Sequence, residues 1–371
     1  MAGASSPSAA SKGAVWELRD VEDALSLVEG WTNSGTCVVR VQPDGTDQFA
    51  GRLSGDVFLA TNYDAGVVVA WRVPFMAGGA VKVAQADVMA SALQVSPQAH
   101  GYVLATTLGQ PEAFYVRVEL PTKKPALVFQ PSAPKDAFFG LVHMSRGPRL
   151  AFFDGDRFVV EQQEQALLAT LPGKGPAEAV VARWSQQSGQ TSLRLERVAY
   201  HQGTFSCLQV LGVSTDFGKT EQLSALLLRM LPMEGSSTLF YVVGAELDKP
   251  RLHTAVLDTK TPMEPMFHHI QDYACSCVTA QRQSCIMQHL ASGVDQSGDW
   301  RVFAAGGFCL LSFNFHLAEF PRTPTEHVWS SRDLGQRVAS ARFSSLAIGS
   351  RHALVPLESG KVVAVPIRSD E

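Results

Sequence analysis

The stretch VFLATNYDAGVVVAWRV, from Val57 to Val73, is where the fold of this chain can first be read. Its first part is an apolar run, and its last part is rich in β-branched residues, which favour extended backbone. Between them lies NYDAG, whose Asp and Gly are turn residues, because Asp tolerates left-handed backbone and Gly has no Cβ to clash. The stretch therefore predicts a hairpin whose second strand ends in Trp71-Arg72.

Strands similar to the second strand of this hairpin recur along the chain. The further copies are Ala113–Leu120, Asp156–Gln162, Gly203–Leu211, Arg251–Leu257, Phe308–Phe315 and Lys361–Ile367. Their centres lie about 42 to 57 residues apart, and repeats of about 40 to 50 residues are typical of the four-stranded blades of propellers. A shorter apolar strand precedes each copy, as in Ala90–Pro97, Val180–Ser185 and Ala225–Pro232. These units predict an all-β fold.

The hairpin also resembles the last two strands of a WD40 blade, in which an Asp-containing turn precedes a strand that ends in Trp-Asp. This resemblance implies a seven-bladed WD40-like β-propeller, with six or eight blades as alternatives because the units at 121–165 and 259–324 are irregular. Length, the hairpin and the segment AVWELR (Ala14–Arg19) further resemble the Bub/Rae family of mitotic-checkpoint and mRNA-export propellers. That family holds a short motif of a partner across one face.

The predicted domain is a single propeller over residues 14–367. Residues 1–13 are small and polar and are expected to form a disordered tail, and residues 368–371 form a short acidic tail. Ala14–Arg19 has no partner within the first unit. We therefore expect it to be the outer strand beside Lys361–Ile367, which closes the ring and removes an exposed sheet edge.

The composition bounds the environment and the partners. Hydrophobic residues at 46% and charged residues at 18% predict a globular chain with a substantial core. A formal net charge of −4 provides no basic field for direct nucleic-acid binding, and no apolar run reaches the length of a membrane span. Most of the six cysteines lie in apolar runs, which favours a reducing, intracellular compartment. The resemblance favours the nucleus, at the kinetochore, with the cytoplasm as the alternative.

No motif predicts a metal, a cofactor or a catalytic centre. The possible zinc ligands His268, His269, Cys275, Cys277, Cys285 and His289 lack the spacing of structural zinc sites. Cys285 and His289, four residues apart on one expected strand, would lie about 13 Å apart. Asp216-Phe217-Gly218 matches a kinase tripeptide, but the other kinase motifs are missing from the sequence, so it is interpreted as a turn.

One recurrence indicates a binding surface. Arg52, Arg183, Arg229 and Arg342 occupy similar places in GRLS, ARWS, LRML and ARFS. A structural interpretation has each arginine packed along its stem and paired to the next blade. The functional hypothesis is a positive ring that receives an acidic or phosphorylated segment, because guanidinium matches carboxylate and phosphate. Trp184 and Met233 are the candidate apolar anchors beside this ring.

These observations together predict a non-enzymatic interaction scaffold. The specific expectation is a kinetochore or mitotic-checkpoint adaptor, a monomer within a larger complex, that holds a short motif of a larger protein and requires neither nucleic acid nor membrane. The alternatives are a propeller subunit of another assembly (nuclear pore and mRNA export, a coat, or a ubiquitin ligase) and a propeller enzyme with an active site at the channel mouth.

Overall fold

The computed structural model places most, but not all, of the chain. The residues it describes are 24–25, 38–41, 55–62, 67–74, 81–86, 92–95, 102–107, 110–119, 126–131, 137–144, 147–155, 157–163, 167–187, 190–215, 217, 222–231, 238–262, 267–273, 286–294, 300–315, 329–340, 346–349, 352–359 and 362–367. All the elements within these ranges are strands, and no helix there is long and apolar enough to cross a membrane.

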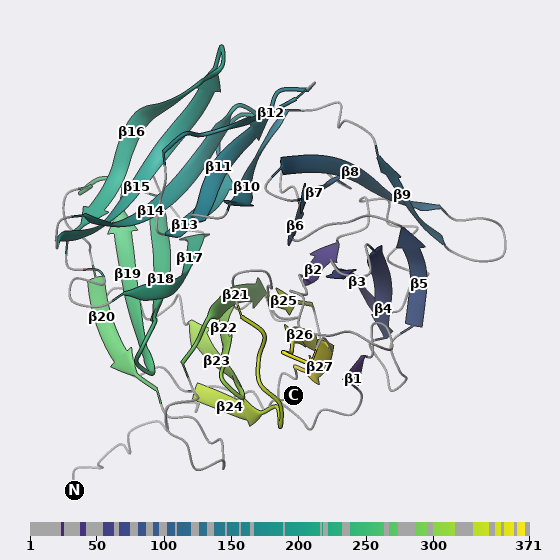
Figure 1. Cartoon of the computed structure of the whole chain (residues 1–371). Helices are drawn as coiled ribbons and strands as arrows, with labels where there is room; N and C mark the ends of the chain where they lie inside the picture. Colours follow the sequence, from purple (N-terminus) through teal and green to yellow (C-terminus); the bar gives the residue numbers. More distant parts are fainter. Residues whose placement is uncertain are drawn as a thin grey trace, which may run out of the picture.

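The described strands form seven antiparallel sheets arranged in a ring (Figure 1). We number the sheets in chain order. Sheet 1 consists of β2 (Val38–Val41), β3 (Gly55–Asn62), β4 (Val67–Pro74) and β5 (Val81–Ala86). Sheet 2 consists of β6 (Ala92–Val95), β7 (Tyr102–Thr107), β8 (Gln110–Glu119) and β9 (Ala126–Pro131). Sheet 3 has three described strands, β10 (Phe138–Met144), β11 (Gly147–Phe153) and β12 (Phe158–Val160).

The later sheets are four-stranded. Sheet 4 consists of β13 (Leu167–Pro172), β14 (Glu178–Gln187), β15 (Gln190–His201) and β16 (Thr204–Ser214). Sheet 5 consists of β17 (Leu223–Leu231), β18 (Leu239–Glu246), β19 (Arg251–Asp258) and β20 (Phe267–Asp272). Sheet 6 consists of β21 (His289–Val294), β22 (Trp300–Gly306), β23 (Cys309–Phe315) and β24 (Trp329–Asp333). Sheet 7 consists of β25 (Ala347–Ile348), β26 (His352–Pro356), β27 (Val362–Pro366) and β1 (Ala24–Leu25).

Contacts between the first strands of successive sheets close the ring. Strand β2 contacts β6, and the contacts continue through β10, β13, β17, β21 and β25 before returning to β2. Each of these strands lies at the inner end of its sheet in Figure 1. The topology of consecutive antiparallel sheets around a closed circle of inner strands is that of a β-propeller. The all-β, propeller prediction is therefore confirmed.

The hairpin that predicted the fold is present. Strands β3 and β4 pair in antiparallel register, with Phe58 opposite Trp71, and Phe58 and Leu59 are fully buried. However, β4 is the third strand of its sheet, because β5 pairs along its outer side. A buried β-rich strand gives the same sequence pattern at any position in a sheet, so the pattern alone does not reveal its rank.

The same ambiguity misplaced the predicted elements of sheet 4 by one strand. Val180–Ser185, predicted as an early strand like Ala225–Pro232, lies in the second strand β14. The described part of the latter, 225–231, lies in the innermost strand β17. Gly203–Leu211 lies in the outermost strand β16, although the corresponding Arg251–Leu257 lies in the third strand β19. Equivalence between repeats in the sequence was therefore wrong in this part of the chain.

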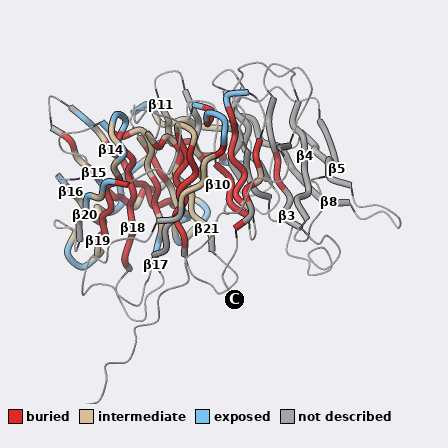
Figure 2. Tube along the Cα trace, turned by 90° about the horizontal axis from the view of Figure 1, so that it is seen from below, coloured by how far each residue is buried: buried red, intermediate tan, exposed pale blue. Residues whose placement is uncertain are grey.

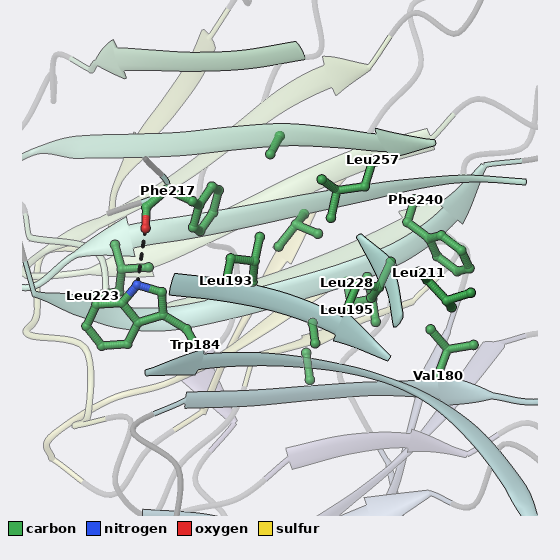
Figure 3. Packing of buried hydrophobic residues seen from close by; sticks show 14 residues of the cluster. Val180, Trp184, Leu193, Leu195, Leu211, Phe217, Leu223, Leu228, Phe240 and Leu257 are labelled. Atoms are coloured by element: carbon green, nitrogen blue, oxygen red, sulfur yellow. Dashed lines mark hydrogen bonds between the residues drawn. The ribbon is translucent and has the colours of Figure 1, made fainter. Parts of the chain in front are cut away.

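The core lies between neighbouring sheets, where the buried parts of the strands in Figure 2 lie side by side. Side chains from sheets 4 and 5 form one such cluster, shown in Figure 3, which includes Leu195, Leu211, Leu228 and Phe240. Two side chains of this cluster pack directly against the backbone of Gly244. A Cβ at this position would lie 2.8 Å from the side chain of Leu223 and 2.9 Å from that of Phe217. Only glycine leaves room for the side chains that fill this contact.

Strand β1 closes sheet 7 from the N-terminal side of the chain. Ala24 lies opposite Val363 and Leu25 opposite Val362, so these residues occupy the outer edge of β27. Closure by an N-terminal strand was expected, and the described strand that closes sheet 7 is Ala24–Leu25. Ala14–Arg19, the segment expected in this place, lies outside the described residues. The short pair Ala-Leu is not recognisable as a strand in sequence.

Removing β1 is expected to destabilise the ring. Deletion of residues 1–25 exposes the edge of β27 at Val362 and Val363, and the lost backbone hydrogen bonds should lower the free energy of unfolding by about 1–3 kcal/mol. Deletion of residues 1–22 removes AVWELR but keeps β1 and should melt like the full chain. Thermal and urea unfolding of the two truncations measure the difference, and equal loss in both would contradict closure by β1.

Candidate functional site

Arg183, a member of the predicted positive ring, lies in a buried ion-pair cluster between sheets 3 and 4. Its Nη1 and Nη2 donate to the two carboxylate oxygens of Glu161 at 2.8 and 2.9 Å. Its Nε donates to Oε2 of Glu196 at 3.1 Å, and Arg194 pairs with the other oxygen of that carboxylate. The side chains of Arg183, Glu161 and Glu196 are 8%, 13% and 9% exposed. Arg183 therefore joins two sheets and is not presented to a partner.

The cluster predicts a strong stability effect at Arg183. Arg183→Met leaves the carboxylates of Glu161 and Glu196 buried without their shared cation, which should cost about 3–5 kcal/mol of unfolding free energy. Arg194→Met is the matched control, because the Arg194 side chain is 49% exposed and its loss should cost less than about 1 kcal/mol. Urea denaturation measures both, and equal stability of the two variants would contradict the bridging role.

Trp184, predicted as an apolar anchor, is a core residue. Its side chain is 2% exposed and packs in the cluster between sheets 4 and 5. The indole Nε1–H donates to the carbonyl oxygen of Phe217 at 3.3 Å, as Figure 3 shows. Phe217, in the Asp-Phe-Gly tripeptide, is fully buried and its ring meets that of His253 edge-on at 5.8 Å. Phe217 thus fills the contact between the two sheets.

Arg229 lies on the innermost strand β17 and donates a hydrogen bond from Nε to the hydroxyl of Ser292 on β21. Burial lowers the pKa of its guanidinium. Its partner belongs to the next sheet, as the structural interpretation of the arginines predicted. Arg229 and Arg183 lie on strands of different rank, so they do not share one circle around the ring. Arg52, Arg342 and Met233 lie outside the described residues.

A buried acid–histidine pair lies at the end of sheet 5. The carboxylate of Glu246, fully buried at the end of β18, accepts a 2.6 Å hydrogen bond from Nε2 of His253 on β19. Arg251 lies 3.6 Å from the same oxygen and donates to Asp272 of β20 at 2.6 Å. The arrangement ties β18, β19 and β20 together. Because His253 and Glu246 are 2% and 0% exposed, the pair cannot meet a substrate in this conformation.

His289, one of the residues considered for zinc, is a buried core residue on the innermost strand β21. Its Nε2–H donates to the carbonyl oxygen of Ala339 at 2.7 Å, which links sheet 6 to the segment that precedes β25. Burial lowers the pKa of the imidazole from its ordinary value of 6.5, and the hydrogen bond to Ala339 raises it in part. Within the described ranges no three His, Cys, Asp or Glu side chains are close enough to hold a metal ion.

The lowered pKa predicts acid sensitivity at His289. Below pH 6.5 the unfolded chain binds a proton at this residue that the folded chain does not. The free energy of unfolding should therefore decrease as the pH is lowered, by up to about 1.4 kcal/mol per pH unit. The contribution is intact above pH 6.5. His289→Gln keeps an amide donor for Ala339 without titrating, so its stability should lose this dependence. Parallel stability curves from pH 8 to 5 would contradict the assignment.

The two cysteines in the described ranges differ in chemical state. Cys207, on the outermost strand β16, is exposed and carries a free thiol, whereas Cys309, on β23, is fully buried and disulfide-bonded. The intracellular, reducing environment expected from the sequence stays a prediction.

Large apolar side chains that are exposed lie on two neighbouring sheets. Within the described ranges they are Leu208 on β16, Met230 on β17, Leu247 after β18 and Ile270 on β20, at 53%, 55%, 45% and 48% exposure. All lie on or directly after strands of sheets 4 and 5, and Met230 and Leu247 lie at opposite ends of sheet 5. Leu208 is the extra residue of a β-bulge, since Arg197 lies opposite Gln209 and Val198 opposite Cys207. Sequence alternation could not reveal this residue, because the bulge breaks the period of two.

Comparison with known proteins adds likenesses of shape only. No protein-family model matches the chain, and no curated protein matches it by sequence. Similar solved structures include the Nup133 β-propeller domain from Vanderwaltozyma polyspora (8% identity over 93% of this chain and 100% of that chain, TM-score 0.42). Another is BamB from Moraxella catarrhalis, at 10% identity over 90% of this chain and 99% of that chain, with a TM-score of 0.43. A third is Drosophila Semaphorin 1a extracellular domains 1–2, at 9% identity over 94% of this chain and 88% of that chain, with a TM-score of 0.47. The fold assignment rests on the sheet topology, and no function is transferred.

Proposed function

We propose that this propeller is a non-enzymatic scaffold that binds a partner protein on sheets 4 and 5. The observation that supports it is the exposed apolar group Leu208, Met230, Leu247 and Ile270. Single exposed apolar residues are ordinary on a protein surface, whereas several on two adjacent sheets favour an interaction site. Leu208 and Ile270 lie on the outermost strands of these two sheets, where a partner can reach them without entering the ring.

The buried polar clusters also support a scaffold role. Arg183, Glu246 and His289 are engaged with protein groups at contacts between strands or sheets. Their bonds fix how neighbouring strands and sheets sit, which favours a rigid frame. A rigid frame presents its binding residues without an entropic cost of ordering them.

The specific role we propose is that of a mitotic-checkpoint adaptor at the kinetochore, in the nucleus, which holds a short motif of a larger partner. Support for it comes from the resemblance of the hairpin at 57–73 and the segment AVWELR to the Bub/Rae propellers. A subunit of a nuclear pore, coat or ubiquitin-ligase assembly is the competing role. Affinity purification of the tagged chain from synchronised cells separates them, because an adaptor of this kind should recover kinetochore proteins and should do so mainly in mitosis.

The apolar surface is tested by charge insertion. The double variant Leu208→Glu, Ile270→Glu should reduce recovery of the stoichiometric partner about tenfold, which corresponds to about 1.4 kcal/mol. Gln209→Glu places the same charge on the neighbouring exposed residue of β16 and is the matched control; it should bind normally. Recovery measured by quantitative mass spectrometry decides the outcome. Equal recovery by both variants would contradict binding at this surface, and absence of any stoichiometric partner would contradict the scaffold role.

A further inference from the structure

Sheet 3 is one strand shorter than the other sheets in the described part of the chain. Its order is β10-β11-β12, while the six other sheets have four strands each. Strand β12 is therefore the outer edge of sheet 3, whereas the third strand of each other sheet is covered by a fourth strand. No described residue pairs along its outer side. In sheet 4, directly next to it, that outward position is filled by β16.

The hydrogen bonds of the β11–β12 hairpin show which backbone groups of β12 point outward. Asp154 N–H donates to Arg157 O at 3.1 Å, and Glu161 N–H donates to Leu150 O at 2.8 Å. In an antiparallel pair, inward and outward residues alternate, so residues 157, 159 and 161 face β11. The N–H and C=O groups of Phe158 and Val160 then point away from the sheet. Within the described part of the chain, neither residue has a backbone hydrogen bond outside the ladder.

This edge is held in place before any ligand arrives. The ring of Phe158 packs on Phe153 and Phe138 with centroids 4.8 and 5.9 Å away. At the other end of the strand, Glu161 is fixed by its two hydrogen bonds to Arg183 of sheet 4. Phe158 and Val160 remain only half-buried, so solvent reaches the strand. A fixed, accessible row of two donors and two acceptors is the geometry that accepts an added strand.

Around the edge, arginine side chains are more exposed than carboxylates. Arg157, at the start of β12, has a side chain 75% exposed, and its contact with Asp154 is loose at 3.8 Å. Arg194, 49% exposed, ends the chain of ion pairs that begins at Glu161. The acidic members of that chain, Glu161 and Glu196, are buried and already paired. The carboxylate of Asp154, which pairs with Arg157, is 28% exposed. An incoming segment therefore meets guanidinium groups that are more accessible than the carboxylates beside them, which favours acidic residues in it.

We infer that the outer edge of β12 is a strand-acceptor site for an extended, acidic segment of another protein, which pairs with Phe158 and Val160 and completes sheet 3 as its fourth strand. The added main chain accepts from and donates to these two residues. Carboxylates at the ends of the segment pair with Arg157 and Arg194. This site goes beyond the apolar surface proposed above, and each can fail without the other, because they lie on different sheets and use different residues.

Amide hydrogen exchange of the full chain tests the site directly. The probe is the synthetic peptide DVTVTVD, capped at both ends, with KVTVTVK and DVTPTVD as the charge and strand-breaking controls. In the free protein the amides of Phe158 and Val160 should exchange fast, while those of Val159 and Glu161 are protected by the ladder. DVTVTVD should slow Phe158 and Val160 by about tenfold or more, and the two control peptides should not.

Two variants at one position separate edge pairing from a change in folding. Val160→Pro removes an outward N–H without removing a bond to β11, so it should weaken peptide binding at least about tenfold at an unchanged melting temperature. Val160→Thr keeps the N–H and the branched shape and should bind like the wild type. Three results would overturn the inference: slow exchange of Phe158 and Val160 without peptide (the chain fills its own edge), a dimer that Val160→Pro dissociates (a second copy fills it), or peptide binding unaffected by Val160→Pro.

Discussion

The structure depends on one constraint, which is that each sheet must bury both of its faces against its neighbours in the ring. A sheet packed on both sides needs apolar residues on both, and β18 shows this directly, because all of its residues from Leu239 to Glu246 are buried. Closure then follows, since an unclosed ring would leave two sheets with a bare face. The contacts from β2 through the other inner strands and back to β2 meet this requirement.

Polar groups that fall within these contacts can stay only if they are paired. Arg183 does so with two carboxylates across the boundary of sheets 3 and 4, and Glu246 does so with His253 within sheet 5. His289 meets the constraint in another way, by remaining neutral and donating to a carbonyl. Burial makes the loss of either partner costly, so these pairs fix the relative placement of strands and sheets more than they add net stability.

The sequence was sufficient to predict the fold class, because the backbone preferences of β-branched residues and of turn residues are local and recur at a regular spacing. The hairpin at 57–73 paired as predicted. Rank within a sheet was not predictable, because a second strand such as β14 and a first strand such as β17 both contain an apolar run followed by an arginine. That ambiguity led to the hypothesis of an arginine ring: Arg183 and Arg229 look equivalent in ARWS and LRML but lie on strands of different rank. Pairing partners such as Glu161, 22 residues from Arg183, are set by the packing of sheets and leave no local signal.

An edge strand is ordinarily a liability, and proteins shield it by twisting it, charging it or covering it. The edge of β16 has two register shifts against β15, between Leu195 and Glu196 and between Arg197 and Val198, which disrupt the regular ladder that a foreign strand would need. Strand β12 has no such shift: its three pairs with β11 are in regular register. Its edge is also short, flanked by Arg157, and fixed through Glu161 to the next sheet. The two edges therefore differ in the regularity of the ladder that each presents. A regular, anchored and short edge limits pairing to a few residues, which is the condition for selecting one segment rather than aggregating with many.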